Sequence, residues 1–178
     1  RSQLLQSGRS ELMSTLRNPM AARLAVTLFL ALALAAGPDH AQAAADGDEA
    51  TAVVMRLQAG LLRLDKETAQ RNNLQRSGVF APLIESTHDL DYMARIALSR
   101  FWGAFSPEQR HRFEVAFRKL SIMGYAARFR DTEGSTFAVD QVRVVPGGRV
   151  EVATHLMVPS EAPVSLNYVL HKGKDGWQ

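Results

Sequence analysis

The adjacent residues His88 and Asp89 come closest, by type and spacing, to a catalytic pair. A histidine beside a carboxylate can act as a general base in nucleophilic catalysis. Such a base needs a nucleophile, and the sequence holds no motif such as G-x-S-x-G that would present one. In the alternative interpretation, Asp89 or Asp91 caps a helix through Leu98, because a carboxylate accepts hydrogen bonds from free N–H groups. We favour the capping role.

Patterns for metal binding are also weak. The five histidines lack a spacing typical of metal ligands, and we expect the last four to be surface residues. They are His40, His88, His111, His155 and His171. The acidic segment 46–49 starts like a calcium loop but lacks the distant glutamate of an EF-hand. We therefore expect a solvated segment there, and neither a metal nor another cofactor.

The sequence has no cysteine, so it offers neither a disulfide nor the cysteine acylated in an exported lipoprotein. Its net charge of +3 comes partly from the N-terminus. Removing residues 1–43 takes away four arginines and two acidic residues and leaves 17 basic against 16 acidic side chains. A near-neutral chain with interspersed charges has no long-range attraction for nucleic acid, so we expect no nucleic-acid partner.

The N-terminal region has the three parts of a secretory signal peptide. Arg17 and Arg23 precede an apolar run over residues 24–36, and Ala41-Gln42-Ala43 is typical of a cleavage site. We expect cleavage after Ala43, with Ala45 as the next choice. The run is shorter than the ~20 residues that a membrane-spanning anchor needs. We therefore expect export, with residues 1–43 as upstream residues and signal peptide.

Helical periodicity follows in residues 44–178, which we interpret as one domain. Apolar residues recur at spacings of three and four over 50–64 and predict a helix there. They are Val53, Val54, Leu57, Leu61 and Leu64. Residues 65–77 are polar and predicted to be helical in part, and residues 79–84 form a second apolar patch around Pro82.

The centre of the chain is a predicted helix pair with a break at residues 103–105. Ser106 can cap the second helix and Pro107 suits its first position, because proline lacks an N–H that would go unpaired there. We predict this helix over 107–129. Its expected buried stripe is Phe113, Phe117, Leu120 and Gly124, with Ala116, Met123 and Ala127 beside it.

After residue 129 the apolar period changes to two, which predicts strands at 137–145, 150–158 and 164–170, with turns between them. Helices first and sheet second indicate an α+β fold, with helices packed on a curved antiparallel sheet. Apolar residues between the layers can form either a filled core or a pocket. Patterning alone favours a core, with Val152, Leu156, Leu166, Tyr168, Phe113 and Phe117 inside it.

One series of residues resembles the MlaC family, the periplasmic phospholipid-binding proteins also called toluene-tolerance auxiliary proteins. The series is Met93-Ala94-Arg95, Phe101-Trp102, Ser106-Pro107-Glu108-Gln109-Arg110, Phe113, Phe117, Leu120 and Tyr125-Ala126. The resemblance extends from about Glu49 to the last residue. Ser99 departs from it, because the family usually has glycine there. By the family's pattern, further strands and a closing helix are expected beyond Gln178, so the chain looks truncated.

The resemblance implies an apolar cavity between sheet and helices that holds phospholipid acyl chains, without catalysis. It implies a periplasmic shuttle between an outer-membrane lipoprotein complex and an inner-membrane ABC lipid transporter, acting as a monomer. The implied wall residues from the sheet are Val150, Val152, Leu156, Leu166 and Tyr168. Those from the helices are Phe101, Trp102, Phe105, Phe117 and Tyr125. The tyrosines can also hydrogen-bond a lipid ester.

Two alternatives stay open. The first is a cell-envelope adaptor with a filled core. The second is an isomerase- or hydratase-like enzyme on a similar scaffold, which needs a carboxylate facing the cavity. Asp140 is its strand candidate, although we expect that side chain to face solvent. Arg143 and Arg149, which flank the turn at 146–148, are interpreted as solvated charges or, alternatively, as contacts for a headgroup.

Overall fold

The computed structural model describes residues 38–178, with side chains from residue 42. By its internal contacts the chain divides into residues 1–44 and 45–178, and the second unit is the one described below. The predicted positive and apolar parts of the signal peptide lie outside the described residues. Within residues 38–178, no helix is long and apolar enough to cross a membrane.

The first described helix, α3 (Pro38–Glu67), begins well before the predicted start at residue 50 and includes the predicted cleavage position. Its predicted apolar stripe is buried throughout. The segment 46–49, expected to be solvated, is part of this helix; Asp48 and Glu49 are exposed, whereas Gly47 is buried. Lys172 forms ion pairs with Asp46 and Glu49, and Trp177 donates a hydrogen bond of 3.2 Å to Glu49. These contacts with the end of the chain hold the segment in the helix.

Helix α4 (Asn73–Thr87) joins the polar segment and the apolar patch that the sequence separates. Asn72 and Gln75 form a capping box at its start, which pairs two otherwise free N–H groups. Pro82 lies inside the helix, where it removes one backbone hydrogen bond. Phe80 and Ile84 on either side are fully buried, so packing outweighs that loss.

Helix α5 (Leu90–Leu98) starts at the predicted cap, since Asp89 accepts a hydrogen bond of 2.9 Å from the Tyr92 N–H. The predicted break is a 3-10 helix, η2 (Ser99–Ala104). Helix α6 (Pro107–Arg128) has the predicted cap and proline. Ser99 has a φ of 48°, a left-handed conformation that favours glycine, the residue usual there in the MlaC family.

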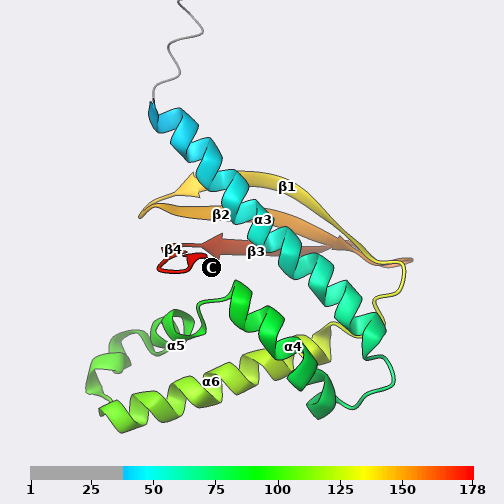
Figure 1. Cartoon of the computed structure of the whole chain (residues 1–178), viewed down its shortest axis with the longest axis horizontal. Coiled ribbons are helices and arrows are strands. Elements are labelled where there is room, and N and C mark those ends of the chain that lie inside the picture. The colour runs from blue at the N-terminus through cyan, green and yellow to red at the C-terminus, as the bar shows by residue number, and fades with distance from the viewer. Residues whose placement is uncertain (1–37) are drawn as a thin grey trace, which may run out of the picture. The chain divides into compact units, whose positions relative to one another are not determined.

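The buried residues of α6 differ from the predicted stripe. Ile122 and Ala126 are buried, whereas Leu120 is 71% exposed and Phe113 and Phe117 are half-buried. The helix packs on α4 and α5. It therefore buries a stripe turned away from the predicted one, because two helices and not the sheet cover most of its length (Figure 1).

The three predicted strands are confirmed and form one antiparallel sheet in the order β1-β2-β3. They are β1 (Thr136–Val145), β2 (Arg149–Met157) and β3 (Val164–Leu170). The register of β1 on β2 shifts at a bulge between Val139 and Gln141. A short hairpin, β4 (Lys172–Gly173) and β5 (Gly176–Trp177), follows. The fold is α+β, as predicted.

Helix α3 crosses one face of the sheet, while α4, α5 and α6 lie beyond β3 (Figure 1). Two clusters of buried residues result. Near the start of α3, Val53 and Val54 pack on Val150 and Val152 of β2. Further along, Leu57 and Leu61 pack with residues of α4, the end of α6 and β2. Between these clusters, β3 faces the helices.

A buried salt bridge holds the helices together where sequence analysis predicted only a polar segment. Arg76 is 0% exposed and donates to Asp65 at 2.9 Å, to Thr68 at 2.8 Å and to the Ala126 carbonyl at 3.0 Å. The second carboxylate oxygen of Asp65 accepts hydrogen bonds from the Thr132 N–H and hydroxyl. Burial alone would raise the pKa of Asp65, but these hydrogen bonds outweigh it and lower that pKa.

Candidate functional site

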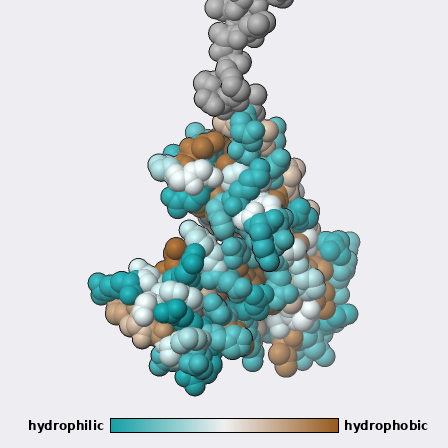
Figure 2. Space-filling view, turned by 60° about the vertical axis from the view of Figure 1, so that its left-hand side comes forward, coloured by the Kyte–Doolittle hydropathy of each residue, from teal (hydrophilic) through white to brown (hydrophobic). Residues whose placement is uncertain are grey.

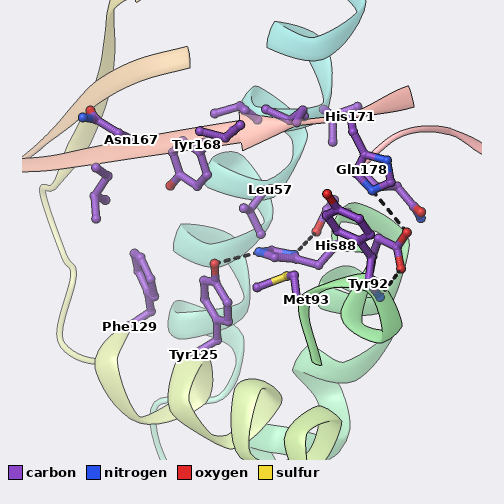
Figure 3. Close-up of a pocket in the computed structure, with 17 residues that line it drawn as sticks. Leu57, His88, Tyr92, Met93, Tyr125, Phe129, Asn167, Tyr168, His171 and Gln178 are labelled. Carbon is purple, nitrogen blue, oxygen red and sulfur yellow. Dashed lines mark hydrogen bonds and ion pairs between the residues drawn. The ribbon is translucent and has the colours of Figure 1, made fainter. Parts of the chain in front are cut away.

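A cavity of about 350 Å³ opens between β3, α3 and the facing ends of α5 and α6 (Figure 3). Its apolar lining comes from Val53, Val54, Leu57, Met93, Phe129, Leu166, Val169 and Leu170. Its polar lining comes from Thr87, His88, Asp89, Tyr92, Tyr125, Asn167, Tyr168, His171 and Gln178. The cavity thus combines apolar walls with polar groups from β3, α5 and α6, as suits an amphipathic small molecule.

His88 and Tyr125 meet inside this cavity. The Tyr125 hydroxyl lies 2.8 Å from His88 Nε2, and His88 Nδ1 lies 3.1 Å from the Ile84 carbonyl oxygen. Because a carbonyl can only accept, Nδ1 carries the proton, and in the neutral ring Nε2 accepts the hydrogen bond from the Tyr125 hydroxyl. These contacts hold the ring between α4 and α6.

Burial favours the uncharged forms of three polar side chains of the cavity, those of His88, Tyr125 and Tyr168. It lowers the pKa of His88, against the opposing effect of the Ile84 carbonyl, and it raises the pKa of Tyr125 to about 12. It also raises the pKa of Tyr168, which a hydrogen bond from Gln58 partly opposes. The hydroxyls of Tyr125 and Tyr168 point into the cavity (Figure 3). Neutral hydroxyls suit an ester or a neutral carbonyl better than an isolated charge.

A second polar contact joins α5 to the end of the sheet. His171 Nε2 lies 3.2 Å from the Asp89 carboxylate, and its ring lies tilted against that of Tyr92 with centroids 4.4 Å apart. The nitrogen and the carboxylate are within ion-pair distance, although their orientation makes no hydrogen bond. This contact lies beside the cavity and connects elements that are otherwise separate there (Figure 3).

The histidine expectations were partly wrong. His88 and His171 are half-buried and both line the cavity, whereas His111 is exposed and His155 pairs with Asp140. Asp140 is exposed, as expected. His88 and Asp89, adjacent in sequence, make separate contacts and do not act as a pair. The carboxylate that does line the cavity is Asp89, already engaged in capping α5 and facing His171.

Three of the predicted wall residues line the cavity: Leu166, Tyr168 and Tyr125. Val150, Val152 and Leu156 lie in the buried clusters under α3, and Phe117 packs against the second cluster. Phe101, Trp102 and Phe105 lie in or next to η2 and do not reach the cavity. Val53 and Leu57 were interpreted as core, because a helix stripe looks the same whether it faces a side chain or a cavity.

A second hollow, of about 520 Å³, lies between α3 and the loop after α6. Its lining is mostly polar, with Asp65, Lys66 and Glu133 among it, and the carboxylate of Asp65 is already fully hydrogen-bonded. Such a surface does not suit an apolar ligand. Among the described residues, no group of acidic, histidine or cysteine side chains is arranged to hold a metal ion.

Comparisons with known proteins identify a family and a fold. The sequence model of one family, described as MlaC protein, matches residues 56–178. Among solved structures, the chain is similar to the phospholipid-binding protein from Ralstonia solanacearum, determined in complex with a phospholipid. The identity is 24%, the TM-score is 0.59, and the match covers 74% of this chain and 73% of that chain. The comparison with curated proteins gave no match.

Proposed function

Since this chain belongs to the MlaC protein family, we propose that it binds phospholipid and carries it between membranes without catalysis. The observation that carries the proposal is the cavity, with apolar walls from Leu57, Leu166 and Leu170 and with the hydroxyls of Tyr125 and Tyr168 facing it. The structure from Ralstonia solanacearum, which has the same fold, contains a phospholipid.

The physical argument concerns the acyl chains. Each CH₂ group of a lipid tail costs about 0.8 kcal/mol to leave in water, so a soluble carrier must enclose most of a chain. In our proposal the tail contacts the leucines of the cavity, while an ester group accepts a hydrogen bond from Tyr168, because the Tyr125 proton is already donated to His88. Contacts to a tail have no direction, so we expect tolerance for different headgroups.

The wider role is also a proposal. The signal-peptide pattern and the absence of cysteine support a soluble protein exported to the periplasm. The resemblance to the MlaC family supports exchange with an inner-membrane ABC lipid transporter and an outer-membrane lipoprotein complex. We propose that the chain acts as their soluble shuttle and as a monomer.

Mass spectrometry of an organic extract from the purified protein tests the proposal. We expect phospholipid in stoichiometric amount. Leu166→Trp fills the cavity and is expected to lose most of the bound lipid while the fold is kept. Leu120→Trp is the matched control, because Leu120 is 71% exposed on α6 and does not line the cavity. Val152 is a poor test position, since it is fully buried and a tryptophan there would disrupt the core.

Two outcomes would contradict the proposal. A folded protein without lipid would favour an adaptor with an empty or filled core. Turnover of a small carbonyl compound that is abolished in Asp89→Asn would favour an enzyme, because Asp89 is the carboxylate that lines the cavity. Equal lipid loads in Leu166→Trp and Leu120→Trp would place the lipid elsewhere on the chain.

A further inference from the structure

The segment from Tyr92 to Arg112, which forms most of α5, η2 and the start of α6, concentrates positive charge. It has four arginines against one acidic residue, Glu108. The flanking acidic residues are Asp91, which pairs with Arg118, and Glu114. The arginines are Arg95, Arg100, Arg110 and Arg112. Within residues 42–178 none of the four forms an ion pair. The near-neutral charge of residues 44–178 is therefore unevenly distributed on the surface.

Three of these arginines lie over aromatic rings. Arg95 lies 5.5 Å from the ring centre of Tyr92, Arg100 lies 4.9 Å from that of Phe101, and Arg110 lies 5.4 Å from that of Trp102. Such pairs occur about once per 70–80 residues in proteins, so three within one short segment are unusual. A guanidinium stacked on a ring can still donate its in-plane N–H groups to phosphate oxygens. Arg110 already donates to the Trp102 and Gly103 carbonyls, so Arg95 and Arg100 have more N–H groups to offer.

Exposed apolar side chains lie in the same segment. Ile96 is 57% exposed and Phe101 is 54% exposed. Arginines together with exposed aromatic and aliphatic side chains are typical of protein surfaces that bind the interface of a bilayer. A nucleic-acid-binding surface would not need an exposed aliphatic side chain such as Ile96. A surface that only contacts solvent would not need an exposed aromatic side chain such as Phe101.

The segment is continuous with the cavity. Tyr92 and Met93 line the cavity, and Ile96 follows Met93 by one turn on the same side of α5. Figure 2 brings the side of α5 forward and shows the surface hollowed there. A lipid that enters or leaves at this place therefore passes close to the arginines.

We propose that this segment docks the protein directly on an anionic phospholipid bilayer. The α5–η2 surface, as we name it, consists of Arg95, Ile96, Arg100, Phe101, Trp102 and Arg110. The arginines meet lipid phosphates, and Phe101 and Ile96 enter the headgroup region. The charge complementarity selects an anionic membrane as the partner. Only the purpose of docking, the exchange of lipid, rests on the proposed function, since membrane binding can be measured by itself.

Flotation of the full chain with protein-free vesicles tests the inference. The vesicles contain phosphatidylcholine with or without a quarter of phosphatidylglycerol. We expect binding to the anionic vesicles that weakens at high salt. The double variant Arg95→Gln/Arg100→Gln is expected to bind roughly 25-fold more weakly, since each arginine near an anionic surface contributes about fivefold. Phe101→Ser is expected to weaken the binding that remains at high salt.

The matched control is Arg56→Gln/Arg71→Gln, which removes the same charge from exposed positions of α3 and of the α3–α4 connection, outside the α5–η2 surface. Equal losses of vesicle binding in both double variants would mean that only the net charge of the protein matters, which would overturn the inference. If the wild-type protein does not bind protein-free vesicles but binds membranes that contain proteins, the inference is overturned and a protein partner is favoured. The lipid load of each variant, measured in parallel, separates a failed docking surface from a failed carrier.

Discussion

The molecule buries polar side chains in two regions, and they differ in how completely those groups are paired. At Asp65 and Arg76, each buried charged group has protein partners, and the two side chains form an ion pair. Around His88 and Tyr125, the groups are neutral and half-buried. His88 is paired with Ile84 and Tyr125, but the hydroxyl oxygens of Tyr125 and Tyr168 still face the cavity. Complete pairing leaves nothing for a ligand and serves the fold. Incomplete pairing beside an apolar wall leaves donors and acceptors for a ligand.

The first prediction breaks the paired region. Arg76→Met leaves the Asp65 carboxylate buried without its cation, so we expect a loss of about 3–5 kcal/mol in the free energy of unfolding. Urea denaturation measures it. Arg63→Met, which removes an exposed ion pair with Glu67, is the control and should cost less than about 1 kcal/mol. A loss at Arg76 no greater than that of the control would mean that the cluster does not hold the helices.

The second prediction separates the two regions by pH. The lowered pKa of His88 means that below about 6.5 the unfolded chain takes up a proton that the folded protein resists. Stability should therefore fall as the pH drops below that value, by at most about 1.4 kcal/mol per pH unit, until the folded pKa is reached. The lowered pKa of Asp65 has the same sign, but its contribution is lost only at pH values below about 3.8.

Urea midpoints measured between pH 7 and pH 3 test this, with His88→Gln as the comparison. The variant should lose the part of the pH dependence that belongs to His88 and keep the acid transition of Asp65. A variant with the same slope as the wild-type protein between pH 7 and pH 5 would mean that His88 does not carry the dependence.

The third prediction concerns Ser99, which lies outside both regions, and it has the smallest expected effect on stability. Ser99 has a φ of 48°, which strains any side chain except that of glycine. Ser99→Gly should raise the free energy of unfolding by roughly 0.5–1 kcal/mol, since the relieved strain exceeds the added freedom of the unfolded chain. Thermal denaturation measures the change. Unchanged lipid content would show that the turn serves only the backbone, whereas a lower melting temperature would mean that the serine hydroxyl has a structural role.

Local sequence patterns determined most of the fold. Period and capping residues predicted helix α6, the cap at Asp89 and all three strands of the sheet, because each depends on residues only a few positions apart. The same patterns misplaced the start of α3 and the buried face of α6. Those two features depend on contacts with Lys172, Trp177 and helix α4, which no local pattern contains.

The candidate site divides in the same way. The resemblance to the MlaC family supplied Tyr125, Leu166 and Tyr168, and the apolar stripes supplied Val53 and Leu57 as buried residues. Only the tertiary structure brought His88 to Tyr125, 37 positions away, and Asp65 to Arg76 and Thr132. The physical reason is that a hydrogen bond between distant residues requires no periodicity. The sequence by itself determined which segments are helix and strand, and the packing of those segments decided which polar groups are fully paired and which face the cavity.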